Sequence, residues 1–308
     1  MDISSIISLI QTSVELGLVS SLTVLALFLS YTMLNVCDLS TDGCFTLGAA
    51  VGAVVALSGH PFLSIPAAML AGVTSGFITG ILQTKMGIDS LLSGIIVNTA
   101  LYSINIAIMG NSSLINLNKT ETVFSMLKTA LGGTSMAGMY KAVIAVIAVA
   151  ATVIFLALFL STRLGLAIRA TGNNPDMVRS SSINPVFTTL VGLCVANAFT
   201  ALSGCMLGQL QKSVNIDIGT GMVTMALASL LIGRAFLGRG KITTRAIGAV
   251  LGAVIFRIVY AVALRFNMPA FMLKFVSSVI VIIAISGPYL KSRIPVIKRR
   301  LSAKKARA

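Results

Sequence analysis

Long runs of apolar residues, each about as long as a bilayer is thick, restrict this 308-residue chain more than any other feature. A bilayer core takes about 20 apolar residues per helical span, and only helices or closed barrels satisfy the backbone inside it. The runs fall at residues 17–36, 44–58, 62–83, 91–110, 140–160, 185–210, 220–237, 246–266 and 270–289. We therefore expect an all-α polytopic membrane protein with about nine (8–10) transmembrane helices, in a single transmembrane domain covering residues 1–308.

Composition excludes several other classes. Charged residues make up 10% of the chain, against roughly 25% in soluble domains. The formal charge of +15 does not indicate a nucleic-acid partner, because no soluble basic face with interleaved aromatic residues is present. The four cysteines show no CxxC spacing, so we interpret them as packing residues and expect no metal site. The N-terminal segment lacks a basic n-region, so we expect no cleaved signal peptide.

The distribution of Lys and Arg orients the spans. Basic residues near span ends stay on the cytoplasmic side, which places Lys85, the loop 163–184 and a basic tail at 290–308 in the cytosol. Counting spans back from 163–184 places residues 111–139 and the N-terminus outside. An extra half-span at residues 3–14, where IISLI is apolar, would change this count.

Two segments, 37–57 and 215–233, resemble one another. Each has an acidic residue and a glycine just ahead of a short run rich in small residues. By the same parity they cross the membrane in opposite directions. Short or glycine-interrupted helices at corresponding positions of an inverted repeat indicate the central pathway of a transporter. The alternative is that both are loops leading into ordinary glycine-rich packing helices.

The polar segment 163–185 predicts a helix-turn-helix on the cytoplasmic face. A first short helix is expected to run through Ala170, because Thr171, Gly172 and the Asn174-Pro175 pair break it. A second should start with Asn174 as N-cap, Pro175 at N1 and Asp176 in the first turn. From composition alone, its basic residues could equally be simple positive-inside anchors.

The runs IRATGNNP (168–175) and DLSTDGCFTLGAAV (38–51) resemble motifs of permease subunits of bacterial ATP-binding-cassette (ABC) importers of the branched-chain amino acid and ribose type. The resemblance covers residues 17 to 290, and the sequence of 37–57 most resembles that of permeases of amino-acid systems, including tryptophan or tyrosine uptake. It implies that the 163–184 loop is a coupling element that docks into the ATPase subunit. The residues implied for this role are Arg163, Arg169, Gly172, Asn173, Asn174, Pro175, Asp176, Arg179 and Asn184.

The resemblance also implies partners that supply what this chain lacks. The sequence contains no GxxxxGK[ST] phosphate loop, so ATP and Mg would bind a separate ATPase, and no cofactor is expected here. The implied assembly contains a second permease copy or related paralogue, two ATPases and an extracytoplasmic solute-binding protein, in the bacterial cytoplasmic membrane. The expected function is import of a small polar solute, with an amino acid favoured over a sugar or nucleoside, by alternating access.

Polar residues at membrane depth are the candidates for the solute pathway, because they are costly there. They are Asp38, Ser40, Asp42, Asn98, Asn197 and Asp217. For the acidic residues the alternative role is helix capping, and for the asparagines it is hydrogen bonding between helices.

Several further residues suggest accessory roles. Arg257 lies mid-span and calls for a buried partner, such as a carboxylate or carbonyl groups, whereas Lys274 can snorkel to the interface. Residues 120–131 predict an amphipathic outer helix, with Thr120 as cap and Val123, Met126, Leu127 and Leu131 on one stripe. The basic tail should contact anionic lipid.

Two other classes compete with the importer permease. An ion-coupled secondary carrier would use its carboxylates for cation coupling and would keep working without ATP. An intramembrane enzyme would need a motif such as HExxH or GxSxG, and neither occurs in the sequence, so we expect no catalytic residues.

Overall fold

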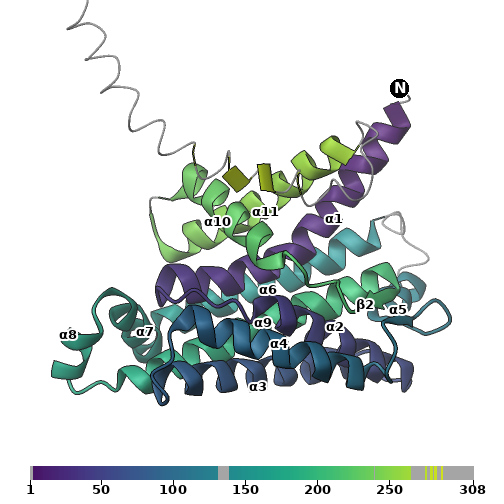
Figure 1. Ribbon diagram of the computed structural model, residues 1–308. Coiled ribbons are helices and arrows are strands. Elements are labelled where there is room, and N and C mark those ends of the chain that lie inside the picture. The colour runs from purple at the N-terminus through teal and green to yellow at the C-terminus, as the bar shows by residue number, and fades with distance from the viewer. Residues whose placement is uncertain are drawn as a thin grey trace, which may run out of the picture.

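The computed structural model describes residues 3–130, 139–238 and 240–264, together with positions 275, 278, 279, 281, 282 and 286. These residues are almost entirely helical (Figure 1). The helices are α1 (Ile3–Leu27) with a π-helical continuation η1 (Phe28–Met33), α2 (Thr41–Leu57), α3 (Ser64–Thr84), α4 (Ser90–Ile108), α5 (Val123–Ala130), α6 (Tyr140–Ser161), α7 (Arg163–Asn173), α8 (Pro175–Ser180), α9 (Pro185–Gln211), α10 (Met222–Leu237) and α11 (Ile242–Leu264).

Six of these helices are long and apolar enough to cross a membrane, so the chain is a multi-pass membrane protein. The candidate spans are Ser8–Met33, Ser64–Thr84, Ser90–Ile108, Tyr140–Ser161, Pro185–Gln211 and Ile242–Ala263. Helices α2 and α10 are apolar but shorter. Eight of the nine predicted runs therefore correspond to helices, six of them of spanning length. The ninth run, 270–289, and the tail 290–308 lie outside the fully described ranges, and nine spans remain a prediction.

The first helix is longer than predicted. It begins at Ile3, not near residue 17, so residues 3–14 are part of α1 and do not form a separate half-span. Its polar residues are compatible with this because their hydroxyl groups bond within the helix: Thr12 Oγ1 donates to the Ser8 carbonyl at 2.9 Å and Ser13 Oγ to the Leu9 carbonyl at 2.7 Å.

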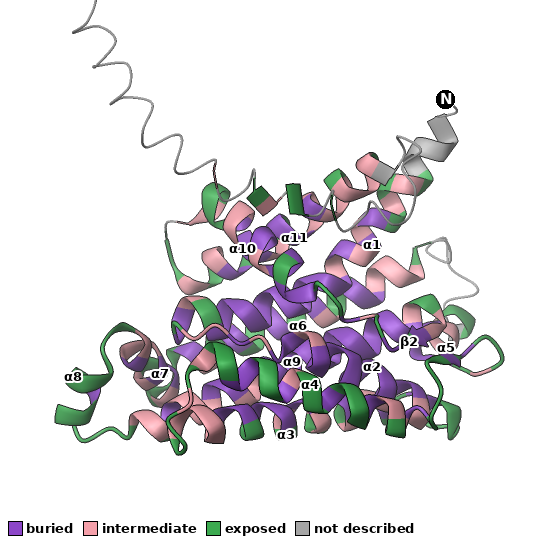
Figure 2. Cartoon of the chain, viewed as in Figure 1, coloured by how far each residue is buried: buried purple, intermediate pink, exposed green. Residues whose placement is uncertain are grey.

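Helix α9 is the centre of the bundle, and α1, α2 and α3 pack directly on it. Glycines permit this close approach. A Cβ built on Gly48 or Gly72 would collide with the backbone of Ala201 or Asn197, and one on Gly204 with the Phe45 carbonyl oxygen. Figure 2 shows the buried residues concentrated in α9, α2 and the middle of α1.

The two ends of the bundle carry different structures. Helices α7 and α8 lie at the left end in Figure 1, whereas α5, β2 and the N-terminus lie at the right. The strand β1 (Leu114–Asn116) pairs antiparallel with β2 (Ser213–Asn215), joining the loops after α4 and α9. The loop 163–184 and the segment 111–130 thus lie at opposite ends, the arrangement that the span parity predicts.

Candidate functional site

The two similar segments meet at the N-termini of the two short helices. Asp42, in the first turn of α2, accepts hydrogen bonds from Gly221 N at 2.9 Å and Val223 N at 2.8 Å at the start of α10. Gly221 has a φ of +84°, a conformation that glycine adopts without steric cost. Gly219 lies so close to Asp42 that a Cβ there would collide with the Asp42 carbonyl oxygen. One carboxylate therefore caps α10 from a helix that runs the other way.

A polar cavity of about 350 Å³ opens beside this joint, between α2, α4 and the segment before α10. Its lining residues are Asp42, Gly43, Thr46, Asn98, Thr99, Tyr102, Ser103, Asn105, Ile216 and Thr220. Asn105 Nδ2 donates to the Gly43 carbonyl at 3.1 Å, while its Oδ1 is buried with no hydrogen-bond partner. The cavity therefore combines a carboxylate, amides and hydroxyl groups at membrane depth.

Three of the predicted pathway residues lie in a buried network behind this cavity. Asn197 Nδ2 of α9 donates to Asp38 Oδ2 at 2.8 Å, and Ser40 N donates to Asp38 Oδ1 at 2.8 Å. Thr79 Oγ1 of α3 lies 3.3 Å from Ser40 Oγ. Asp38 is 2% exposed and Asn197 is 1% exposed. These groups fasten the segment before α2 to α3 and α9, and they do not line the cavity.

Of the six predicted residues, the structure brings Asp42 and Asn98 to the cavity. Asp217 does not reach it: it lies exposed in the turn before α10, where its carbonyl accepts from Thr220 Oγ1 at 2.8 Å. Residues Tyr102, Asn105 and Thr220 line the cavity and were not predicted. The signal for Tyr102 and Asn105 in the sequence is the polar stripe of α4, where Asn98, Tyr102 and Asn105 recur at helical spacing in an apolar span.

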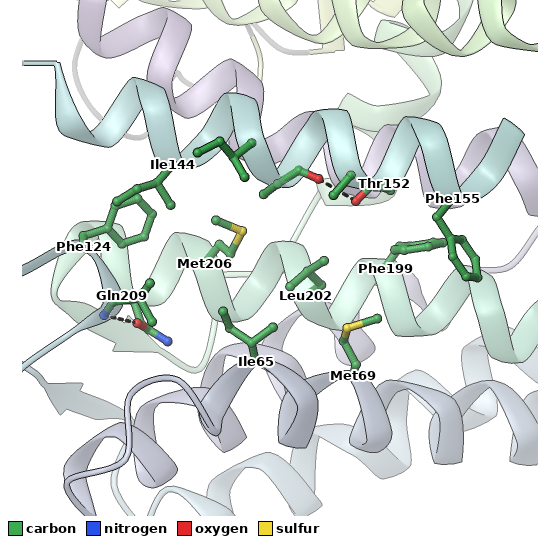
Figure 3. A pocket seen from close by; sticks show the side chains of 14 residues that line it. Ile65, Met69, Phe124, Ile144, Thr152, Phe155, Phe199, Leu202, Met206 and Gln209 are labelled. Atoms are coloured by element: carbon green, nitrogen blue, oxygen red, sulfur yellow. Dashed lines mark hydrogen bonds between the residues drawn. The ribbon is translucent and has the colours of Figure 1, made fainter. Parts of the chain in front are cut away.

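A second cavity, of about 450 Å³, is apolar and lies between α3, α5, α6 and α9 (Figure 3). Gln209 closes one end, where its Oε1 accepts from Val123 N at 3.0 Å. Helix α5 starts at Val123 with Thr122 as its cap, since Ser125 N donates to Thr122 Oγ1. The predicted cap, Thr120, is therefore wrong, and Leu131 of the predicted stripe lies outside the described residues. This cavity offers little to hold a polar solute.

The predicted helix-turn-helix of residues 163–185 is present as α7 and α8, which together form an elbow at one end of the bundle. Asn174 Oδ1 accepts from Asp176 N and Met177 N, each at 3.1 Å, with Pro175 at the first position of α8. This confirms the predicted start of the second helix. The first helix does not end at Ala170: it continues to Asn173.

The longer α7 results from local packing. Thr171 Oγ1 lies 2.8 Å from both the Ala167 carbonyl and Thr188 Oγ1 of α9. Gly172 packs on the Met33 carbonyl oxygen at the end of η1, where a Cβ would not fit. The sequence indicates a break at Thr171 and Gly172, but these residues fit inside the helix because their neighbours are η1 and α9.

The elbow has one attached side and one exposed side. Ile168 and Val178 are 0% and 1% exposed, and Asn184 caps α9 by accepting from Val186 N at 3.0 Å. Arg163, Asn173, Asn174, Pro175, Asp176 and Arg179 are exposed, and Arg169 is half-buried. Met177 is 53% exposed on α8. The exposed side is thus available to another protein, while the attached side contacts the ends of α1 and α9.

Comparison with known proteins identifies the family. Residues 9–285 match the family described as branched-chain amino acid transport system permease component. The chain is 31% identical to the tyrosine transport system permease protein of Clostridioides difficile over 280 residues, covering 91% of this chain and 90% of that protein. It is 28% identical to the nucleoside ABC transporter permease protein NupB of Lactococcus lactis over 180 residues, covering 52% of this chain and 48% of that protein. No solved structure matches the chain. The chain therefore belongs to the family of branched-chain amino acid transport system permeases.

Proposed function

We propose that this chain is the permease of a binding-protein-dependent ABC importer in a bacterial cytoplasmic membrane, and that it moves an amino acid by alternating access. The observation that carries the proposal is the elbow of α7 and α8, which is packed tightly on η1 and α9 and exposed on its other side. Such an element can receive a partner and transmit its movement to two spans.

Rigid attachment is what this coupling requires. Because Gly172 contacts the backbone of Met33 and Thr171 bonds to Thr188, a displacement of the elbow must move the ends of α1 and α9. An ATPase that binds one packing of the bundle more tightly than the other shifts their equilibrium by its difference in affinity. ATP and Mg would remain on the ATPases, two of which would serve two permease copies.

The polar cavity supports passage of a polar solute between the repeats. It lies where the oppositely directed α2 and α10 begin, which is the position expected of a central site in inverted-repeat transporters. A small rearrangement at the Asp42 joint would change the packing of both short helices together.

An amino acid is the solute that the relatives favour. The family is described for branched-chain amino acids, and the Clostridioides relative, named for tyrosine transport, matches nine-tenths of the chain. A nucleoside is the second candidate, because the Lactococcus relative is named a nucleoside permease. Competition of labelled tyrosine uptake by unlabelled leucine or uridine separates the two.

The coupling role is tested with a matched pair of methionines. Met177 on α8 and Met86 after α3 are 53% and 64% exposed, and Met86 follows a span that ends on the elbow's side. In proteoliposomes that hold the permease, its ATPase and the binding protein, Met177→Asp should reduce ATP-driven uptake at least about tenfold, since a charge in a protein interface costs several kcal/mol. Met86→Asp should transport normally.

Two results would contradict this proposal. One is full uptake by Met177→Asp with unchanged solute-stimulated ATP hydrolysis. The other is uptake that continues without ATP and stops when an ion gradient is dissipated, which would indicate a secondary carrier.

A further inference from the structure

Arg257 of α11 is an intramembrane cation with no anionic partner among the described residues. Its Nε is buried without a hydrogen bond, and the ion pairs of the described residues do not include it. Its guanidinium carbon lies 5.8 Å from the centroid of the Tyr260 ring. A charge at membrane depth is costly unless it is neutralised or reaches the interface.

The chain offers few carboxylates for this role. Glu15 of α1 is 6% exposed and accepts from Gln11 Nε2 at 3.3 Å, but it makes no ion pair with Arg257. The sequence after Leu264 contains no Asp or Glu at all. Asp2 lies outside the described residues, and Glu121, before α5, is exposed.

Arg257 lines a cavity of about 320 Å³ between α1 and α11, together with Leu9, Thr12, Ser13, Leu16 and Tyr260 among others. The hydroxyl protons of Thr12 and Ser13 are donated to carbonyls within α1, and the polar side chains of Arg257 and Tyr260 also line the cavity. Leucine side chains supply the apolar part of the wall. The lining therefore suits a group with anionic oxygens at one end and hydrocarbon at the other.

The depth of this cavity matches a lipid headgroup region. Its lining residues Ser8, Leu9, Thr12 and Ser13 come from the first half of α1, and long basic side chains extend from such positions to the interface. The C-terminal end of α11 lies beside the start of α1, opposite the elbow (Figure 1). The cavity shares no lining residue with the polar cavity at Asp42, so the two are separate.

We propose that Arg257 and Tyr260 form a binding site for the phosphate of an anionic phospholipid in the leaflet opposite the elbow. The lipid phosphate completes the hydrogen bonding of the guanidinium, and the acyl chains lie along the apolar surfaces of α1 and α11. The site goes beyond transport itself and does not depend on the identity of the solute.

The test compares lipids that share acyl chains. The full-length protein in detergent is titrated with phosphatidylglycerol or phosphatidylcholine, and bound lipid is counted by native mass spectrometry. Wild-type protein should bind phosphatidylglycerol at least about tenfold more tightly, as charge-assisted contacts permit. Arg257→Gln should lose this preference, whereas Lys119→Gln, which removes an exposed charge from the loop after β1, should keep it. Arg257→Lys keeps the positive charge but lacks the planar guanidinium, so it should retain part of the preference for phosphatidylglycerol. This variant tests the site without placing an uncharged side chain at position 257.

Three outcomes would overturn the site. Equal binding of both lipids by wild-type protein would show that the site does not select an anionic headgroup. A preference that survives in Arg257→Gln would place the lipid elsewhere. Displacement of the lipid by the transported solute, or by inorganic phosphate alone, would make this a site for soluble anions.

Discussion

Asp42 and Asp38 are only four residues apart, but their carboxylates have different structural roles. The Asp42 carboxylate caps the start of α10 and lines the polar cavity, so it joins α2 to the segment before α10. The Asp38 carboxylate is buried and takes its hydrogen bonds from Asn197 and Ser40. We infer that Asp38 holds the bundle together and that Asp42 is the residue in position to respond to a solute.

Substitution of Asn197 should expose this difference. Asn197→Ala leaves a buried carboxylate with one hydrogen-bond donor fewer, which should cost about 1.5–3 kcal/mol of stability. Asn98 lines the cavity and is only half-buried, so Asn98→Ala should change the stability by less than about 0.5 kcal/mol. Thermal unfolding of the detergent-solubilised proteins measures both. Equal midpoints for the two variants would refute the structural role of the Asp38–Asn197 bond.

For single residues, the sequence identifies the unusual polar side chains but not their hydrogen-bond partners. Asn174 could be predicted as a cap because its effect is local and the following Pro175 fixes the helix start. Asp38 and Asn197 could each be selected as unusual residues, but 159 positions separate them and neither helix signals the pairing. The capping of α10 by Asp42 was missed for the same reason.

Glycines allow neighbouring helices to pack closely. Helix α3 lies along α9 with Gly72, Gly76 and Gly80 facing it. Without side chains at these positions the two backbones approach more closely than leucine or valine would permit, and dispersion contacts replace the hydrophobic driving force that lipid cannot provide. The packing of α3 on α9 is tighter toward the N-terminus of α3, because Gly72 contacts backbone atoms more closely than Gly80 does.

Two alanine substitutions on α3 should differ in effect. The Cβ of Gly72→Ala would lie 2.7 Å from Ala201 Cβ and collide with the Asn197 carbonyl, so overpacking should destabilise the protein by about 1–3 kcal/mol. In Gly80→Ala the new Cβ lies 3.3 Å from Leu190 Cα, and alanine's better helix propensity should offset most of the strain. Comparable losses of thermal stability in both variants would show that α3 and α9 are not packed as described.

Most element positions follow from the lengths of the apolar runs, and the errors lie where polar residues form hydrogen bonds inside a helix. Eight of the nine apolar runs correspond to described helices, because each holds a long hydrophobic stretch. The start of α1 and the end of α7 were misplaced, because the hydroxyl groups of Thr12 and Thr171 bond back to carbonyls and let the helices continue. Such bonds depend on the surroundings of each residue and leave no separate pattern in the sequence.

At the scale of the whole molecule, the elbow lies at one end of the bundle and the polar cavity lies where two short helices begin. Both parts are fastened to α9, through Thr188 at the elbow and Asn197 behind the cavity. The opposite directions of α2 and α10 could be predicted from loop charge, because positive residues mark one side. Their contact through Asp42 could not, because it depends on how the two repeats pack. The coupling of elbow and cavity requires that the elbow face the compartment that contains ATP.

Accessibility of single cysteines tests this requirement most directly. In a variant whose four native cysteines are replaced by alanine, Ser181→Cys is placed on the exposed turn after α8 and Ser112→Cys beside β1 at the other end. A membrane-impermeant maleimide applied to intact spheroplasts should label Ser112→Cys, and should label Ser181→Cys only after the membrane is permeabilised. Labelling of Ser181→Cys in intact spheroplasts, with Ser112→Cys protected, would contradict the account.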